Sequence, residues 1–251
     1  MLSLEQALEA LRGARIVDLA QPYYPGMPHW PTHPPFAAAR TKEHGDFLLP
    51  GGASSSAELI ALGTHTGTHI DALCHFSRDG RLHRGLDARA LGVDTVPPIV
   101  ARGLLYDAAP GGELGEDAGI AAAQLEAALA AYGPREGDVV LIRTGWGRRW
   151  RDARSFLNGQ RQPGLLLDAA QWLSARGVRA VGADNVALER IPSPEMPVHV
   201  HLLVEAGVHI LECLNLEALA EAGAREFVFV AAPLRIEGAT GAPVRPFALV
   251  F

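Results

Sequence analysis

Cysteine is scarce in this 251-residue chain, and no long apolar run occurs. The two cysteines, Cys74 and Cys213, allow one disulfide at most, and a chain of this length buries enough apolar surface to fold without any. No apolar stretch approaches the ~18 residues that a membrane-spanning helix needs. The first residues lack the cationic start of a signal peptide. We therefore expect a protein of a reducing, cytoplasmic compartment that has no membrane partner.

An excess of positive charge is also missing. Lysine and arginine number 22 against 28 acidic residues, and the resulting net charge of -6 disfavours nucleic acid as a partner. The hydrophobic fraction of 48% excludes a chain that is disordered throughout. The sequence contains no P-loop, no G-x-G-x-x-G and no G-x-S-x-G nucleophile elbow. The common nucleotide-binding and serine-hydrolase motifs are therefore excluded.

Helical and strand patterns alternate through the second half of the chain, which favours an α/β fold with part of its sheet parallel. A first helix is predicted at 3–12, where Ser3 and Gln6 fit a capping box. One domain, residues 1–251, is expected because no linker or repeat interrupts the chain. Further helices are predicted at 121–132, 165–176, 200–206 and 216–222, and strands at 15–20, 98–106, 139–143, 179–183, 208–211, 226–231 and 246–251.

Two segments favour loops or contacts over regular structure. Residues 21–35 carry six prolines together with Tyr24 and Trp30, which predicts an irregular loop whose aromatics either pack on the surface or bind a ligand. The run GWGRRWRDAR at 145–154 could stack on RNA bases. Asp152 and the acidic balance of the chain favour a solvated helix end or a subunit contact instead.

Histidine is concentrated in one short segment, THTGTHIDALCH. His65, His69, Asp71 and His75 fall within eleven residues, and an extended segment would place them on one face. A straight strand would separate the Cα atoms of His65 and His69 by ~13 Å, so a bend at Gly67 is expected to bring them within reach of one ion. Imidazoles with a carboxylate suit Zn²⁺, Mn²⁺ or Fe²⁺. Scattered, backbone-bonded polar groups would not share one register, so the pattern predicts a catalytic metal site.

A second group of histidines and acids follows in MPVHVHLLVEAGVHILECL. It contains His199, His201, Glu205, His209 and Glu212. Glu205 and His209 could be ordinary surface residues as well as members of a site. Glu212 stands inside the apolar string ILECL, where a carboxylate is costly to bury unless it is paired or bound to a cation. Glu212 is therefore the most informative acid of the chain.

The string HTGTHIDALCH, from His65 to His75, matches every fixed position of the pattern H-x-G-T-H-x-D-x-x-x-H. The chain thereby resembles the metal-dependent cyclase-like hydrolases, a family that includes bacterial kynurenine formamidase and isatin hydrolase. The resemblance extends to a D-L strand with a P-G loop at 18–28 and to the strings PVH, GVHILE and APLRIEGATGAPVRP.

The resemblance implies a swivelling β/β/α fold with a mixed sheet, and a homodimer or homotetramer. It also implies one or two divalent ions, Mn²⁺ or Zn²⁺, with His65, His69 and Asp71 as ligands. His75 matches the family's proton-transfer histidine and Glu212 a later glutamate ligand. Of the two histidines that could complete the site, His199 is favoured over His201 because of its PVH context.

The N-terminal loop departs from the formamidase pattern. Tyr24 stands where formamidase-type members carry a tryptophan, and PGMPHWP follows in place of PGDTP. This difference leaves kynurenine formamidase itself open. We expect hydrolysis of a linear or cyclic amide in a small aromatic substrate, with Tyr24 and Trp30 stacking on it. Two alternatives stay open: a natural-product cyclase with the same metal site, and a non-catalytic metal- or small-molecule-binding protein.

Overall fold

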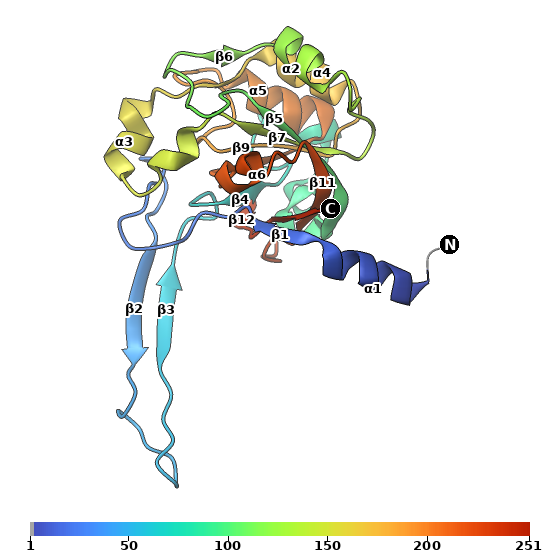
Figure 1. Ribbon diagram of the computed structural model, residues 1–251. Coiled ribbons are helices and arrows are strands. Elements are labelled where there is room, and N and C mark those ends of the chain that lie inside the picture. Colours follow the sequence, from blue (N-terminus) through green and yellow to red (C-terminus); the bar gives the residue numbers. More distant parts are fainter. Residues whose placement is uncertain (1–2) are drawn as a thin grey trace.

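A nine-stranded mixed sheet forms the centre of the protein in the computed structural model, which describes residues 3–251 (Figure 1). Its strand order is β1-β13-β11-β5-β7-β9-β10-β4-β12, and the four strands from β5 to β10 run parallel while the other neighbours pair antiparallel. The strands are β1 (Arg15–Asp18), β4 (His69–Asp71), β5 (Ile99–Asp107), β7 (Val139–Arg143), β9 (Ala180–Ala183), β10 (His209–Glu212), β11 (Glu226–Ala231), β12 (Gly241–Pro243) and β13 (Phe247–Val250). The expected α/β class with a partly parallel sheet is confirmed.

Helices lie on both faces of this sheet, except α1, which projects from the body. They are α1 (Leu4–Gly13), α2 (Ala122–Leu129), α3 (Ala153–Leu157), α4 (Leu167–Ser174), α5 (Pro197–His199), a π-helical segment η6 (Val200–Ala206) and α6 (Glu217–Glu221). Successive side chains of β7 point to opposite faces of the sheet, because the side chains of a strand alternate with a period of two residues. Val140 and Ile142 pack with α2, α4 and η6, whereas Val139 and Leu141 join the core that contains Leu219 of α6.

Most expected elements occur, with ends that differ by a few residues. The predicted strand 139–143 is β7, and the predicted helix 165–176 is α4 with shorter ends. The capping box of Ser3 and Gln6 is present at α1. Residues 21–35 form no helix or strand, as their prolines predict. Part of this loop joins a third core cluster through Met27, Tyr24 and Trp30.

The largest element that the sequence patterns did not predict is a hairpin of β2 (Ala37–Lys42) and β3 (Ala57–Ala61). The hairpin forms its own two-stranded sheet and projects from the body, as α1 does at another point (Figure 1). A second small sheet pairs β6 (Gly119–Ile120) with β8 (Gly164–Leu165). Within residues 3–251, no helix has the length and apolar character needed to cross a bilayer.

Candidate metal centre

Three candidate ligands share one face of a strand pair. In the antiparallel register of β4 and β10, Glu212 lies opposite His69, and Ile210 lies opposite Asp71. Directly opposed residues point to the same side of a sheet, and so do residues two apart on one strand. The side chains of His69, Asp71 and Glu212 therefore converge, while Ile70 turns into the core. Glu212 stands at the carboxyl end of a parallel strand, where α/β sheets commonly bind ligands.

His65 reaches the same place through a turn rather than along a strand. The sequence predicted an extended segment from 65 to 71, but the observed strand β4 begins only at His69. The bend falls at Gly67, whose φ is 74°. A Cβ atom there would lie 2.5 Å from the ring of Tyr23, so both the backbone angle and the space require glycine. This turn brings His65 Nδ1–H to within 2.7 Å of Asp71 Oδ1, to which it donates.

His199 is contributed by the short helix α5. Its Nε2 lies 3.2 Å from Glu212 Oε1 and 4.0 Å from Asp71 Oδ2. Its Nδ1–H donates to Glu189 Oε1 at 2.7 Å, and its backbone N–H donates to the same oxygen at 3.1 Å. Because Glu189 accepts at Nδ1, the lone pair of Nε2 faces the carboxylates.

The cluster leaves two buried polar atoms without a hydrogen-bond partner among residues 3–251. They are His69 Nε2 and Asp71 Oδ2. His69 Nδ1–H donates to the Gly67 carbonyl at 2.8 Å, so the neutral ring presents a lone pair at Nε2, 3.3 Å from Asp71 Oδ1 and 3.4 Å from Glu212 Oε2. Buried acceptors that face one another are costly unless a cation or a proton lies between them.

These residues fit a divalent metal. The ligand atoms of His65, His69 and Asp71 lie within 4.8 Å of one another, and so do those of Asp71, His199 and Glu212. Two imidazoles with a carboxylate, or one imidazole with two carboxylates, are donor sets that Zn²⁺ and Mn²⁺ accept. Asp71 belongs to both groups and could serve two ions.

In the ion-free chain, protons occupy the place of a cation. Burial lowers the pKa of His69, but the hydrogen bond and charge of Asp71, with the charge of Glu212, outweigh burial and raise it to about 9. The pKa of His199 is raised to about 10 because hydrogen bonds to Glu189 and Glu212 overcome the effect of its burial. Two imidazolium protons therefore partly neutralise the carboxylates at pH 7, and a metal must displace them.

His75 behaves in the opposite way. Its ring stacks on that of His65, with centroids 3.7 Å apart. Burial lowers the pKa of His75 to about 3; the attraction of Asp71 opposes this shift, and repulsion from the neighbouring imidazoles adds to it. Burial is thus the largest cause of the shift. His75 is neutral at pH 7 and able to accept a proton.

A cavity of about 220 Å³ adjoins the cluster. Trp30 lines it, whereas Tyr24 is not among its lining residues: the Tyr24 hydroxyl donates to the Trp150 carbonyl at 2.7 Å. A substrate contact by Tyr24 stays a prediction. The walls combine imidazoles and a carboxylate with apolar and aromatic groups, namely Trp30, His33, His65, His75, Phe76, Val186, Ala187, Met196, His199 and Glu212.

Several other candidates lie outside this cavity. His201 contacts Glu205 and the Ser174 hydroxyl, and His209 Nδ1–H donates to the backbone carbonyl of Asp71 at 3.0 Å. Trp146 and Trp150, from the arginine-rich run at 145–154, are buried and therefore not available to stack on RNA bases.

Sequence reasoning missed Glu189, Thr240 and His33. Glu189 fixes His199, and the Thr240 hydroxyl lies 2.8 Å from His65 Nε2. His33 lines the cavity, and its Nδ1 lies 3.4 Å from the His65 carbonyl oxygen. Glu189 stands in the mixed string LERIPSPE, where apolar and polar residues follow no period, so its burial could not be read from its neighbours.

Comparison with known proteins identifies the family. A family model described as "Putative cyclase" matches residues 17–190, more than half of the chain, so the chain belongs to this family. The kynurenine formamidase of Bacillus cereus is similar to it, with 26% identity over 231 residues that cover 91% of this chain and 94% of the relative.

Two solved structures share the fold. Isatin hydrolase A from Ralstonia solanacearum has a TM-score of 0.84 at 29% identity, with 100% of this chain and 98% of that chain covered. A structure described as a predicted metal-dependent hydrolase from Bacillus stearothermophilus has a TM-score of 0.65 at 25% identity, with 94% and 98% covered. Family, relatives and cluster together define a hydrolase of the cyclase family with a candidate site for a divalent metal.

Proposed function

We propose that this protein hydrolyses the amide bond of a small aromatic amide or lactam with the help of divalent metal. The observation that carries the proposal is the pair of unpartnered buried atoms, His69 Nε2 and Asp71 Oδ2, in a cluster that borders a cavity. A purely structural cluster would satisfy its own polar atoms, because an unpartnered buried group costs free energy.

The ligands we propose are His65, His69, Asp71, His199 and Glu212, in two groups joined by Asp71. Mn²⁺ and Zn²⁺ both suit these donors. When bound, such an ion lowers the pKa of a coordinated water toward ~7 and polarises a carbonyl oxygen. The chain itself holds the ligand atoms in place: Gly67 accepts from His69, and Glu189 accepts from His199.

His75 is the residue we propose for proton transfer. It lines the cavity but belongs to neither group of potential ligands among residues 3–251. Its lowered pKa keeps the ring neutral at pH 7, so it can take a proton from water and pass it to the leaving nitrogen. Stacking on His65 holds the ring beside the cluster.

The substrate class follows from the walls of the cavity and from the relatives. Trp30 and Phe76 offer flat apolar surface, and Val186, Ala187 and Met196 add aliphatic wall, which suits an aromatic ring. One relative is named for a formamide and another for isatin, which is a cyclic amide. An amide, linear or cyclic, is the common element.

Metal analysis followed by a substrate screen tests this proposal. The purified protein is assayed for bound metal, and turnover of N-formylkynurenine, isatin and simple lactams is followed by absorbance with and without that metal. Metal-dependent cleavage of at least one amide supports the proposal. Metal without cleavage, together with condensation of an open-chain acid, would indicate a cyclase. Tight metal binding with neither reaction would indicate a binding protein.

A further inference from the structure

One polar residue of the cavity wall has no part in the proposed mechanism. The imidazoles and the carboxylate of the wall come from His33, His65, His75, His199 and Glu212. Every one of these except His33 is a proposed ligand or the proton-transfer residue. The rest of the wall is apolar or aromatic, and in such a pocket a few placed polar groups orient the ligand and give specificity. His33 is therefore a candidate for substrate recognition.

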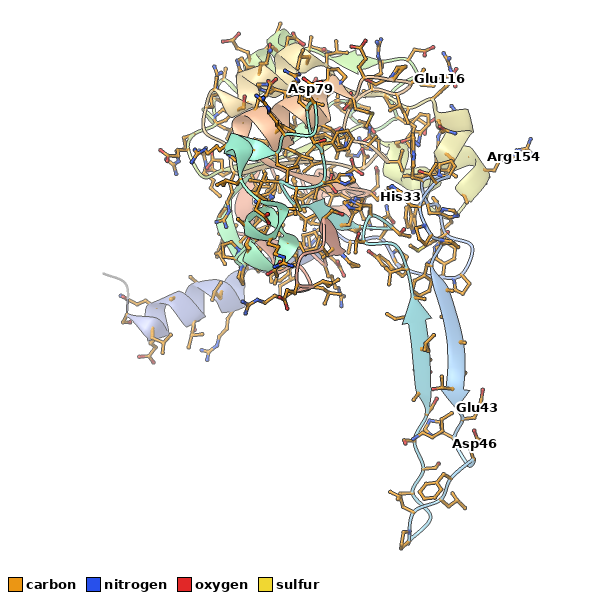
Figure 2. The ribbon with its side chains drawn as sticks, turned by 180° about the vertical axis from the view of Figure 1, so that it is seen from behind. His33, Glu43, Asp46, Asp79, Glu116 and Arg154 are labelled. Carbon is orange, nitrogen blue, oxygen red and sulfur yellow. The ribbon has the colours of Figure 1, made fainter. Side chains whose placement is uncertain are left out.

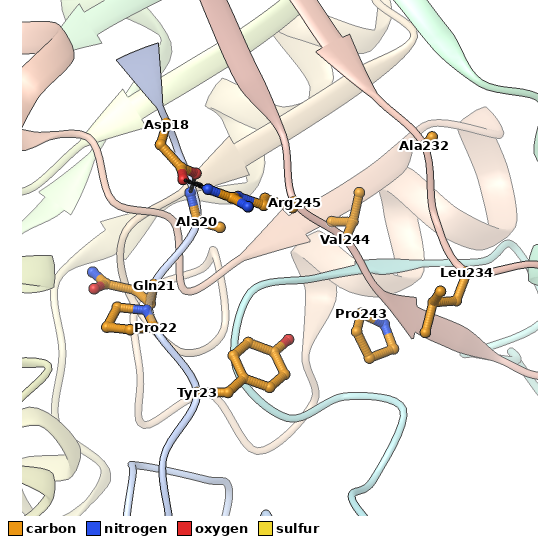
Figure 3. A pocket seen from close by; sticks show the side chains of 10 residues that line it. All are labelled: Asp18, Ala20, Gln21, Pro22, Tyr23, Ala232, Leu234, Pro243, Val244 and Arg245. Atoms are coloured by element: carbon orange, nitrogen blue, oxygen red, sulfur yellow. Dashed lines mark hydrogen bonds and ion pairs between the residues drawn. The ribbon is translucent and has the colours of Figure 1, made fainter. Parts of the chain in front are cut away.

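Hydrogen bonds fix both ends of the loop that carries His33. Figure 3 shows Tyr23 at the start of the loop, where its hydroxyl donates to the Thr68 carbonyl at 2.6 Å. At the other end, the Thr66 hydroxyl donates to the Pro34 carbonyl, next to His33, at 3.0 Å. Both anchors belong to the string THTGTH, which also carries two of the proposed ligands. The loop is therefore held directly against the metal cluster.

The imidazole of His33 borders the cavity with one of its two nitrogens engaged. Its Nδ1–H donates to the His65 carbonyl at 3.4 Å, and among residues 3–251 the ring has no other hydrogen-bond partner. The residue is half-buried, and Figure 2 places it on the body of the molecule, well away from Glu43 and Asp46 on the hairpin. Histidine is ordinarily neutral at pH 8, so one ring nitrogen carries the proton and the other a lone pair. Because Nδ1 carries the proton here, Nε2 is an acceptor.

The proposed substrate class offers one donor that matches this acceptor. An aryl formamide or an unsubstituted lactam has a carbonyl oxygen, which accepts, and a single N–H, which donates. A buried N–H that finds no acceptor costs free energy. The ligand atoms of His65, His199 and Glu212 are turned toward the cluster, and His75 is needed to carry the proton. Nε2 of His33 is the acceptor of the wall that remains.

We propose that Nε2 of His33 accepts a hydrogen bond from the N–H of the scissile amide, so that the enzyme selects secondary amides over N-alkylated ones. The inference rests on the proposed function and narrows its substrate class. The rings of His33 and His75 both neighbour that of His65, with centroids 5.7 and 3.7 Å from it. One leaving nitrogen can thus donate its N–H to His33 and take the proton of His75 on its lone pair.

Two pairs of compounds that differ by one N-methyl group test the proposal: isatin with N-methylisatin, and formanilide with N-methylformanilide. kcat/KM is measured at pH 8 for the metal-loaded parent protein. Each value is divided by the rate constant for cleavage of the same compound by hydroxide, which removes differences in intrinsic reactivity. The parent should favour the N–H compound by at least ~100-fold, because a site that pairs with a substrate N–H rejects the analogue that lacks it.

Two substitutions of His33 separate recognition from structure. His33→Leu removes the acceptor, so the preference should shrink to less than ~10-fold through a loss of kcat/KM for the N–H compounds alone. His33→Gln keeps an acceptor in its side-chain oxygen and should retain much of the preference. His29→Leu is the matched control, because the Nδ1–H of His29, on the same loop, donates to the Trp30 carbonyl at 3.0 Å and His29 does not line the cavity. A loss in His33→Leu that falls equally on both members of each pair would mark a structural role and overturn the proposal.

Equilibrium binding distinguishes a failure of this proposal from a failure of the proposed function. Calorimetric titration of the metal-loaded parent and of His33→Leu with the same compounds needs no turnover. The parent should bind the N–H compounds more tightly than their N-methyl analogues, and His33→Leu should not. If no compound is cleaved, the proposed function fails, while this difference in binding still supports recognition of the N–H by His33. A parent that shows no preference for the N–H compounds, in binding or in turnover, overturns the proposal.

Discussion

His199 and Glu189 form a buried pair in which the imidazole Nδ1–H donates to the carboxylate at 2.7 Å. Ser193 holds the second carboxylate oxygen at 2.8 Å. A carboxylate in this position fixes the ring so that Nε2 faces the cluster. Loss of such a partner typically weakens metal binding by ~10–100-fold, and we expect a loss of that size here.

Glu189→Gln should therefore weaken metal binding by that factor, measured by competition with a chelator of known affinity. Glutamine keeps the shape of the side chain and removes its charge. Glu205→Gln is the matched control, because Glu205 pairs with His201 outside the cavity. Equal losses in the two variants would show that the effect comes from general charge removal and not from His199.

Asp71→Asn removes one charge from the residue shared by both ligand groups. We expect metal content, measured by elemental analysis, to fall well below that of the parent. Unchanged stoichiometry and affinity would rule out Asp71 as a ligand.

Glu212→Leu separates a ligand from a structural carboxylate. The ion pairs of Glu212 among residues 3–251 are with His69 and His199, and no arginine pairs with it there. The variant should fold, because leucine suits the apolar string around it, and should lose metal or turnover. A variant that keeps its metal and full turnover but is destabilised by ~3–5 kcal/mol would favour a structural role instead.

His75→Ala separates chemistry from binding. A proton-transfer group is typically worth ~10²–10⁴-fold in rate, so kcat should fall by about that factor while metal occupancy stays near the parent value. The acidic limb of the pH–rate profile should flatten, since the group that must be deprotonated is gone. Loss of metal would show that His75 is a ligand, and an unchanged kcat would remove it from the mechanism.

The ion-free protein should lose stability as pH rises. The pKa of His199 is raised to about 10 in the fold, above its ordinary 6.5, so its proton is bound more tightly in the folded than in the unfolded state. This contribution to the free energy of unfolding is fully present below pH 6.5 and disappears as pH rises through about 10. The Tm of chelated protein should fall across that window, and bound metal should suppress the fall. A flat Tm in chelated protein would contradict the raised pKa.

The sequence predicted the first part of the cluster and the alternation of helices and strands because both depend on short-range spacing. Gly67, His69 and Asp71 lie within five residues, and the period of a strand relates the last two directly. The convergence of Glu212 and His199 with them depends on the register of β4 against β10 and on where α5 enters, neither of which local spacing specifies.

Glu189 and the β2–β3 hairpin were missed for physical reasons. The burial of Glu189 results from packing between distant segments, so the mixed apolar and polar residues around it in the sequence gave no sign of it. Strand β2, Ala37–Lys42, reads AAARTK and has no alternation of polar and apolar residues, since neither face meets a core in the chain itself. A strand without a buried face leaves no period-2 pattern to detect.

The central claim, that this cluster supports metal-dependent amide hydrolysis, is tested most directly by reconstitution. Chelator-treated protein is titrated with Mn²⁺ or Zn²⁺ while cleavage of an aryl formamide or lactam that the parent protein turns over is recorded. Turnover should be lost on chelation. It should then rise with added ion and level off once one or two equivalents per chain are bound, and His69→Ala should not regain it. Turnover that persists in metal-free protein, or that returns equally in His69→Ala, would contradict the account.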